Sequence, residues 1–215
     1  MITKERWMNL CLRIGAEDNP ITRTNINARY NELIAAYTGP DRHYHNLDHI
    51  NDGLEKIDKV RHLAWNPDAI EMAWWWHDFV YNTKSKLNED KSAEMADNVL
   101  REFKVSIELR AWIIALIYAT KHIYLPEPED YDLCLMIDID LASLGAPPEI
   151  FDRNTANIRK EQAWLSIRDF RKGRVEFFRK MLKDRPSVYL TQCFRDKYEA
   201  QAQENLKRTM AVLND

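Results

Sequence analysis

Apolar residues recur along this chain with the spacing of an α-helix, and no segment alternates convincingly with the two-residue period of a strand. The pattern therefore predicts an all-α protein. Proline near helix starts and glycine near helix ends give the boundaries. Before the C-terminal third, helices are predicted over 3–14, 20–38 and 46–62, in a Trp-rich segment ending near Tyr81, over 89–103 and 105–120, and in a segment ending at Gly145.

The C-terminal third is charged and amphipathic, which predicts two or three packed helices broken near Gly173 and Pro186. No internal repeat, low-complexity stretch or Gly/Ser-rich linker interrupts the chain. A single domain over residues 1–215 is therefore expected.

The amino-acid composition disfavours several classes of fold and of binding partner. Only five glycines occur in 215 residues, which disfavours a turn-rich β fold and a glycine-rich phosphate loop. The hydrophobic fraction of 45% is enough for a large core. Net charge is −3 with both signs interspersed, so neither nucleic acid nor a membrane is expected as a partner, although a local basic groove stays possible.

Three cysteines, Cys11, Cys134 and Cys193, lie far apart and form no C-x-x-C pair. This usage is typical of free thiols in a reducing compartment rather than of disulfides or a thiolate zinc site. The first residues lack an apolar signal-peptide core, and no run approaches the roughly 18 apolar residues of a spanning helix. A cytoplasmic protein is expected.

An adjacent His77-Asp78 pair lies inside an almost wholly apolar segment, residues 72–81. A buried carboxylate is costly unless a cation neutralises it, and no Lys or Arg is near in sequence. A bound metal ion is the simplest partner. The alternative is a hydrogen-bonded core histidine with Asp78 as a cap, which three neighbouring tryptophans around a mid-helix acid make less attractive.

His45 and His49 are four residues apart and would share one helix face, although His45 is close enough to the helix start to lie in a loop. Asn46 stands where a zincin helix would carry its Glu base, so that motif is absent. Two interpretations stay open: a pair directed at one ion or substrate, or ordinary surface histidines.

Asp138 and Asp140 lie two apart in a second apolar run, so on a helix they point to roughly opposite sides. At least one must be buried, and only one is expected to face a metal site.

Four further residues are weaker candidates. His122 follows the apolar segment 105–120 and either projects into a pocket or caps the helix. Lys121 and Arg42 are candidates for binding an anionic group, and Glu89 for orienting a water molecule. Each also has a simpler explanation as an exposed residue or a helix-terminal charge.

These elements, in this order, resemble the HD superfamily of metal-dependent phosphohydrolases, whose pattern is a His, a His-Asp pair and a distant Asp. The resemblance is closer to a bacterial branch of predicted metal-dependent HD phosphohydrolases and spans nearly the whole chain. One departure is Gln203, where that branch has Arg. The matching segments are 42–50, 76–81, 88–89 with 92–93, 119–122, 138–145, 158–161, 173–174 and 204–206.

The resemblance implies an HD-type helical domain with a metal-binding core over about 41–145 and C-terminal helices, about 147–213, packed on it. It implies a divalent ion, one of Mn, Zn, Fe, Co, Ni or Mg. The implied ligands are His49, His77, Asp78 and Asp138, with Asp140 as the alternative to Asp138.

The activity implied is hydrolysis of a phosphate ester of a small molecule, expected to be a nucleotide, by metal-activated water. His45 would protonate the leaving group, and Asp78 or Glu89 would accept the proton of the water. The implied phosphate-binding residues are Arg42, Lys121 and His122. Two alternatives stay open: a non-catalytic nucleotide-binding or regulatory HD module, and a di-iron HD oxygenase.

Overall fold

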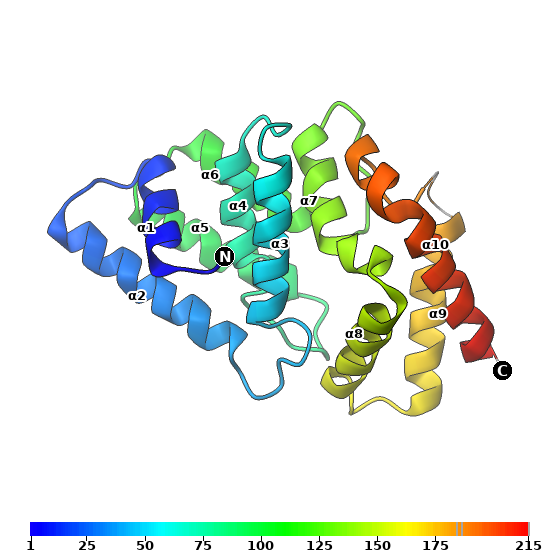
Figure 1. Ribbon diagram of the computed structural model, residues 1–215. Helices are drawn as coiled ribbons and strands as arrows, with labels where there is room; N and C mark the ends of the chain where they lie inside the picture. The colour runs from blue at the N-terminus through cyan, green and yellow to red at the C-terminus, as the bar shows by residue number, and fades with distance from the viewer. Residues whose placement is uncertain (184, 186, 215) are drawn as a thin grey trace. The chain divides into compact units, whose positions relative to one another are not determined.

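A computed structural model describes residues 1–183, 185 and 187–214. Across these residues the chain forms ten α-helices, one short 3-10 helix and no strand, so the all-α prediction is confirmed (Figure 1). The elements are α1 (Lys4–Arg13), α2 (Pro20–Tyr37), α3 (Leu47–Val60), α4 (Pro67–Trp76), α5 (Asn88–Glu102), α6 (Ile107–Ala119), α7 (Tyr131–Leu141), η1 (Ala142–Gly145), α8 (Pro148–Glu161), α9 (Ile167–Lys183) and α10 (Gln192–Asn214).

The chain divides into two compact units, Met1–Met136 and Ile137–Asp215. The division falls inside α7, so it does not coincide with a linker. The expected single domain, with a core over about 41–145 and C-terminal helices packed on it, stays a prediction.

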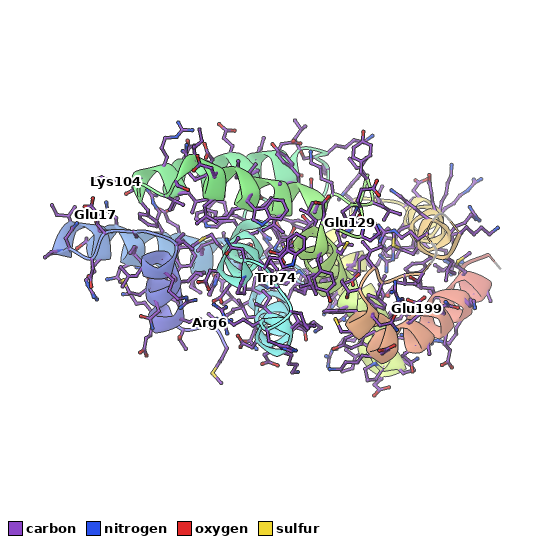
Figure 2. All side chains as sticks on the ribbon, turned by 90° about the horizontal axis from the view of Figure 1, so that it is seen from above. Arg6, Glu17, Trp74, Lys104, Glu129 and Glu199 are labelled. Carbon is purple, nitrogen blue, oxygen red and sulfur yellow. The ribbon has the colours of Figure 1, made fainter. Side chains whose placement is uncertain are left out.

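Helix α4 lies at the centre of the first unit, where it packs against α1, α3, α5 and α6. Its three tryptophans, Trp74, Trp75 and Trp76, are fully buried, and Figure 2 shows Trp74 among the helices of this unit. Trp7 of α1 packs edge-on against Trp75, with ring centroids 5.5 Å apart. Burial of a large side chain contributes about 1.5–3 kcal/mol, so this run anchors α4. The three tryptophans are therefore part of the core of this unit.

Asparagine caps begin three helices of the first unit. Asn19, Asn46 and Asn66 each accept a hydrogen bond from a backbone amide in the first turn of α2, α3 and α4 respectively. Pro20 and Pro67 occupy the first helical positions of α2 and α4, where a missing N–H costs nothing. Each cap contributes about 1 kcal/mol. The predicted starts of these helices are accordingly correct to within a residue or two.

The predicted break at Gly173 is wrong, because α9 continues through it from Ile167 to Lys183. An exposed glycine costs a helix only about 1 kcal/mol relative to alanine, and the buried Phe170 and Phe178 hold α9 on both sides of it. The chain instead leaves the helical conformation between α8 and α9. The predicted break near Pro186 falls on a residue outside the described part of the chain.

In the second unit α10 packs against α9 and against η1 (Figure 1). The Asn205 side chain donates hydrogen bonds to the carbonyls of Leu144 and Ala146, at 2.9 and 2.8 Å. Gly145 permits the close approach, because a Cβ there would lie 2.6 Å from the Tyr198 carbonyl oxygen. These contacts tie the end of η1 to α10.

All three cysteines are free thiols, two of them buried, in agreement with the sequence. Among the described residues, no helix combines the length and apolar character that crossing a membrane requires.

Candidate metal centre

Three side chains of the first unit bring one ligand atom each to a common point. His49 Nε2 lies 3.3 Å from His77 Nε2, and Asp78 Oδ2 lies 3.1 Å from His77 Nε2 and 3.7 Å from His49 Nε2. Ligand atoms about 2.0–2.2 Å from one ion are about 3.0–3.5 Å apart at octahedral or tetrahedral angles. The three separations are therefore close to those of a single coordinated cation, and the buried group could hold one.

Close packing of α3 on α4 places His49 beside His77. The Trp74 indole donates a 2.8 Å hydrogen bond to the carbonyl of Ile50. Gly53 makes this approach possible, because a Cβ at that position would lie 2.0 Å from the indole ring. The same ring packs against both imidazoles, with centroids 4.9 Å from His49 and 4.3 Å from His77.

The hydrogen bond at Nδ1 of His77 fixes the tautomer of the ring. Nδ1 lies 2.8 Å from the carbonyl oxygen of Trp74, which only accepts, so Nδ1 carries the proton. In the neutral ring the Nε2 lone pair then faces His49 and Asp78. Metal-ligating histidines are held in this way, with the second ring nitrogen donating to a carbonyl or carboxylate.

The Trp-rich helix ends five residues earlier than predicted, at Trp76, so Asp78 is not in mid-helix. His77 is the C-terminal cap, and Asp78 lies in the turn that follows. The Arg42 guanidinium holds this turn, because it donates 2.8 Å hydrogen bonds to the carbonyls of Asp78 and Phe79. These carbonyls therefore have partners outside a helix.

The Asp78 carboxylate is only 13% exposed. Burial by itself would raise the pKa of this group, but the imidazoles of His77, His45 and His49 outweigh it and hold the pKa well below the usual range. Asp78 is therefore an anion at neutral pH, in a position where a cation is electrostatically favoured.

His45 lies in the loop before α3, so the two histidines of this segment have different positions, as the sequence allowed. Its ring packs 4.3 Å from Tyr81 and 4.8 Å from Tyr44, centroid to centroid. It is not one of the three grouped ligands, but its charge contributes to the lowered pKa of Asp78. Its predicted role as a proton donor stays a prediction.

Arg42 donates its hydrogen bonds to backbone carbonyls, and its guanidinium lies over the rings of Tyr37 and Tyr81, 5.2 and 5.0 Å from their centroids. Besides the carbonyls of Asp78 and Phe79, it donates to the carbonyl of His45 at 3.0 Å. It thus holds the loop before α3 against the turn after α4. Its predicted role in binding phosphate stays a prediction, as does that of His122, which follows α6 with a left-handed φ of 53°.

Glu89 is within electrostatic reach of both Asp78 and Lys121. Burial raises the pKa of Glu89, the negative charge of Asp78 adds to this, and Lys121 opposes it. The Lys121 ammonium also lies 2.6 Å from the Asp90 carboxylate. Part of the positive charge of Lys121 is thus already compensated. The predicted catalytic role of Glu89 and the predicted phosphate-binding role of Lys121 remain untested.

Asp138 belongs to the second unit and is fully buried. Its two oxygens accept hydrogen bonds from the amides of Leu190 and Thr191, both at 2.7 Å, and from the Thr191 hydroxyl at 2.6 Å. Asp140 is half-buried on the same helix. The expectation that at least one acid of the pair is buried is confirmed. Which of them binds metal stays a prediction.

Sequence reasoning included Ser92 among the residues that carry the resemblance but missed that it positions the segment after the ligands. Ser92 accepts a 3.0 Å hydrogen bond from the amide of Val80 and so fixes the segment after Asp78. Gly53 was also missed, although an isolated glycine inside an amphipathic helix is a signal of close backbone approach.

No protein-family model, no curated protein and no solved structure matches this chain.

Proposed function

We propose that this chain is a metal-dependent phosphohydrolase of the HD type, acting on a phosphate ester of a small molecule, with nucleotides the favoured class. One observation carries the proposal. The buried nitrogens of His49 and His77 and one oxygen of Asp78 converge at 3.1–3.7 Å, and these residues follow the sequence order of the HD pattern.

The three grouped residues would hold a divalent cation, which when bound lowers the pKa of a coordinated water to near neutrality and polarises a phosphoryl oxygen. A mixed imidazole and carboxylate set suits Zn, Fe, Co, Ni or Mn better than Mg, which prefers oxygen ligands. Asp138 is the proposed fourth ligand and Asp140 the alternative.

His45 supplies a proton to the leaving alkoxide in this proposal. Its contacts with Tyr44 and Tyr81 restrict the ring, and its side chain is half-buried rather than exposed. A positioned imidazole contributes typically about 10²–10⁴-fold to such a step, because its pKa lies near working pH.

Glu89 or Asp78 accepts the proton of the attacking water. The raised pKa of Glu89 makes it the better base near neutral pH, whereas the lowered pKa of Asp78 makes that carboxylate a weak base. Arg42, Lys121 and His122 are the proposed contacts for the phosphate oxygens, whose charge grows in the transition state.

The test compares metal content and phosphate release of the wild type with those of Asp78→Ala. Asp48→Ala is the matched control, because Asp48 is an exposed acid next to His49 on α3. Each protein is analysed for metal after purification and assayed with a panel of nucleotides and other phosphate esters. We expect metal near one ion per chain in the wild type and control and its loss in Asp78→Ala, with release reduced by about 10³-fold or more.

Other outcomes overturn the proposal in different ways. Metal binding with no release from any ester, but tight nucleotide binding, identifies a regulatory module. Two irons per chain with oxygen consumption identifies an oxygenase. Equal metal content in Asp78→Ala and the wild type shows that the three grouped residues do not form a metal centre.

A further inference from the structure

A basic groove follows helix α9 in the second unit. Its volume is about 1020 Å³, and it extends from Ile167 to Arg179 along α9, with Leu213 near the end of α10 on its wall. At 1.5 Å per residue, this part of α9 is about 18 Å long, or more than three turns. The side chains lining this α9 groove are Ile167, Arg168, Arg171, Lys172, Val175, Glu176, Arg179 and Leu213.

Four of these lining residues are cations and one is an acid. Arg168, Arg171, Lys172 and Arg179 are exposed and form no ion pair with any residue that the structure describes. Other arginines of the chain are paired with carboxylates, among them Arg6, Arg13, Arg23, Arg29, Arg61 and Arg208. Among the described residues, the groove lining therefore has an excess of positive charge, which Glu176 offsets only in part.

The lining also contains aliphatic side chains. Ile167 is 64% exposed and Leu213 is partly exposed, whereas Val175 is only 7% exposed. A ligand that fills this groove must therefore present carboxylates or other anions to the cations, and apolar groups to the aliphatic residues.

We infer that the α9 groove binds an acidic amphipathic helix of a partner protein. A helix laid along α9 presents apolar residues, spaced at i, i+3, i+4 and i+7, to the exposed side chains of Ile167 and Leu213. Glutamates flanking that stripe then meet the arginines, whose planar groups bind carboxylates through two parallel hydrogen bonds. The length of the groove matches a helix of about 12 residues.

The lining favours this occupant over two others. Single-stranded nucleic acid is bound by aromatic side chains that stack on bases, and the lining residues named above include none. An anionic membrane presents a broad surface, whereas the lining here surrounds a concave space that suits a rod-shaped ligand.

The test uses full-length protein and a fluorescein-labelled synthetic helix of about 14 residues, with leucines in an i, i+3, i+4, i+7 stripe and glutamates beside them. Binding is followed by fluorescence anisotropy. The groove variant is Arg168→Glu with Arg171→Glu. Lys197→Glu with Lys207→Glu is the matched control, because it makes the same change in net charge at exposed positions of α10 outside the groove. Ile167→Ser tests the apolar contact without changing charge.

We expect the groove variant to bind the peptide about tenfold or more weakly, Ile167→Ser to bind it several-fold more weakly, and the control to bind it like the wild type. Circular dichroism confirms that each variant is folded. The inference is overturned if the peptide does not bind, or if groove variant and control weaken it equally. The inference is also overturned if single-stranded RNA or phosphatidylserine vesicles bind more tightly than the peptide and the groove variant loses that binding. The groove is then assigned to that ligand.

Discussion

Two buried aspartates show how neighbours decide the state of a single residue. Both lie in apolar runs of the sequence and look alike there. The pKa of Asp78 is held low because three imidazoles face its carboxylate. Burial raises the pKa of Asp138 to about 6, although hydrogen bonds from Leu190 and Thr191 partly oppose the rise. Asp78 is accordingly suited to a cation, while Asp138 already serves as an acceptor for backbone amides.

Asp138 therefore has a structural role that can be separated from metal binding. In Asp138→Ala the amides of Leu190 and Thr191 and the Thr191 hydroxyl lose their acceptor. We expect a loss of about 2–4 kcal/mol in the free energy of unfolding, measured by urea denaturation of protein treated with a chelator. Asp138→Asn, which keeps one carbonyl acceptor, should lose less. If the loss occurs only in metal-loaded protein, the residue acts as a ligand and its hydrogen bonds contribute little.

At the scale of elements, the candidate centre depends on two helices meeting closely. Helix α3 carries His49, and α4 ends directly before His77. Gly53 and Trp74 set the distance between them, because the indole occupies the space where a side chain on Gly53 would lie. The separation of the two imidazoles therefore follows from backbone packing as much as from the histidines themselves.

Two glycine-to-alanine substitutions should have opposite effects. In Gly53→Ala the new methyl group overlaps the Trp74 ring, so α3 and α4 must move apart. We expect a loss of about 1–3 kcal/mol in stability and weaker metal binding. Gly173→Ala is the control, because a Cβ there meets nothing within 4 Å and lies inside α9. It should stabilise the protein by about 0.5–1 kcal/mol. Thermal and urea denaturation measure both changes, and equal effects would contradict this account of Gly53.

At the scale of the whole molecule, acidic and basic residues are unevenly distributed between the two units, although the net charge is small. The first unit, residues 1–136, has 22 acidic and 16 basic residues, whereas the second has 12 acidic and 15 basic ones. Helix α9 alone carries seven Lys or Arg and two acids. Within the first unit, by contrast, opposite charges pair at the surface, as at Lys104 and Glu17, which are 2.9 Å apart (Figure 2).

Metal binding should stabilise the segments that carry its three grouped ligands more than it stabilises α9. The three grouped ligands lie in the first unit, so a cation bound there favours its folded state. At a free concentration 100 times the dissociation constant, the expected gain is about 2.7 kcal/mol. Hydrogen exchange, with and without Zn²⁺ or Mn²⁺, should show slower exchange of α3 and of residues 77–80, and little change in α9. Asp78→Ala should show no such effect. Equal protection of α3 and α9 would contradict the assignment.

Helical periodicity, asparagine caps and proline positions determined the all-α class and most helix starts, because these signals act within a few residues of chain. The His77-Asp78 pair in an apolar run was enough to predict a buried polar group. The contacts of the turn after α4 could not be predicted, because Arg42, which binds its carbonyls, lies more than thirty residues earlier. The hydrogen-bond partners of Asp138 could not be predicted either, since they come from a segment about fifty residues away. Local sequence determines where helices form, and only packing between distant segments decides which donors, acceptors and charges meet.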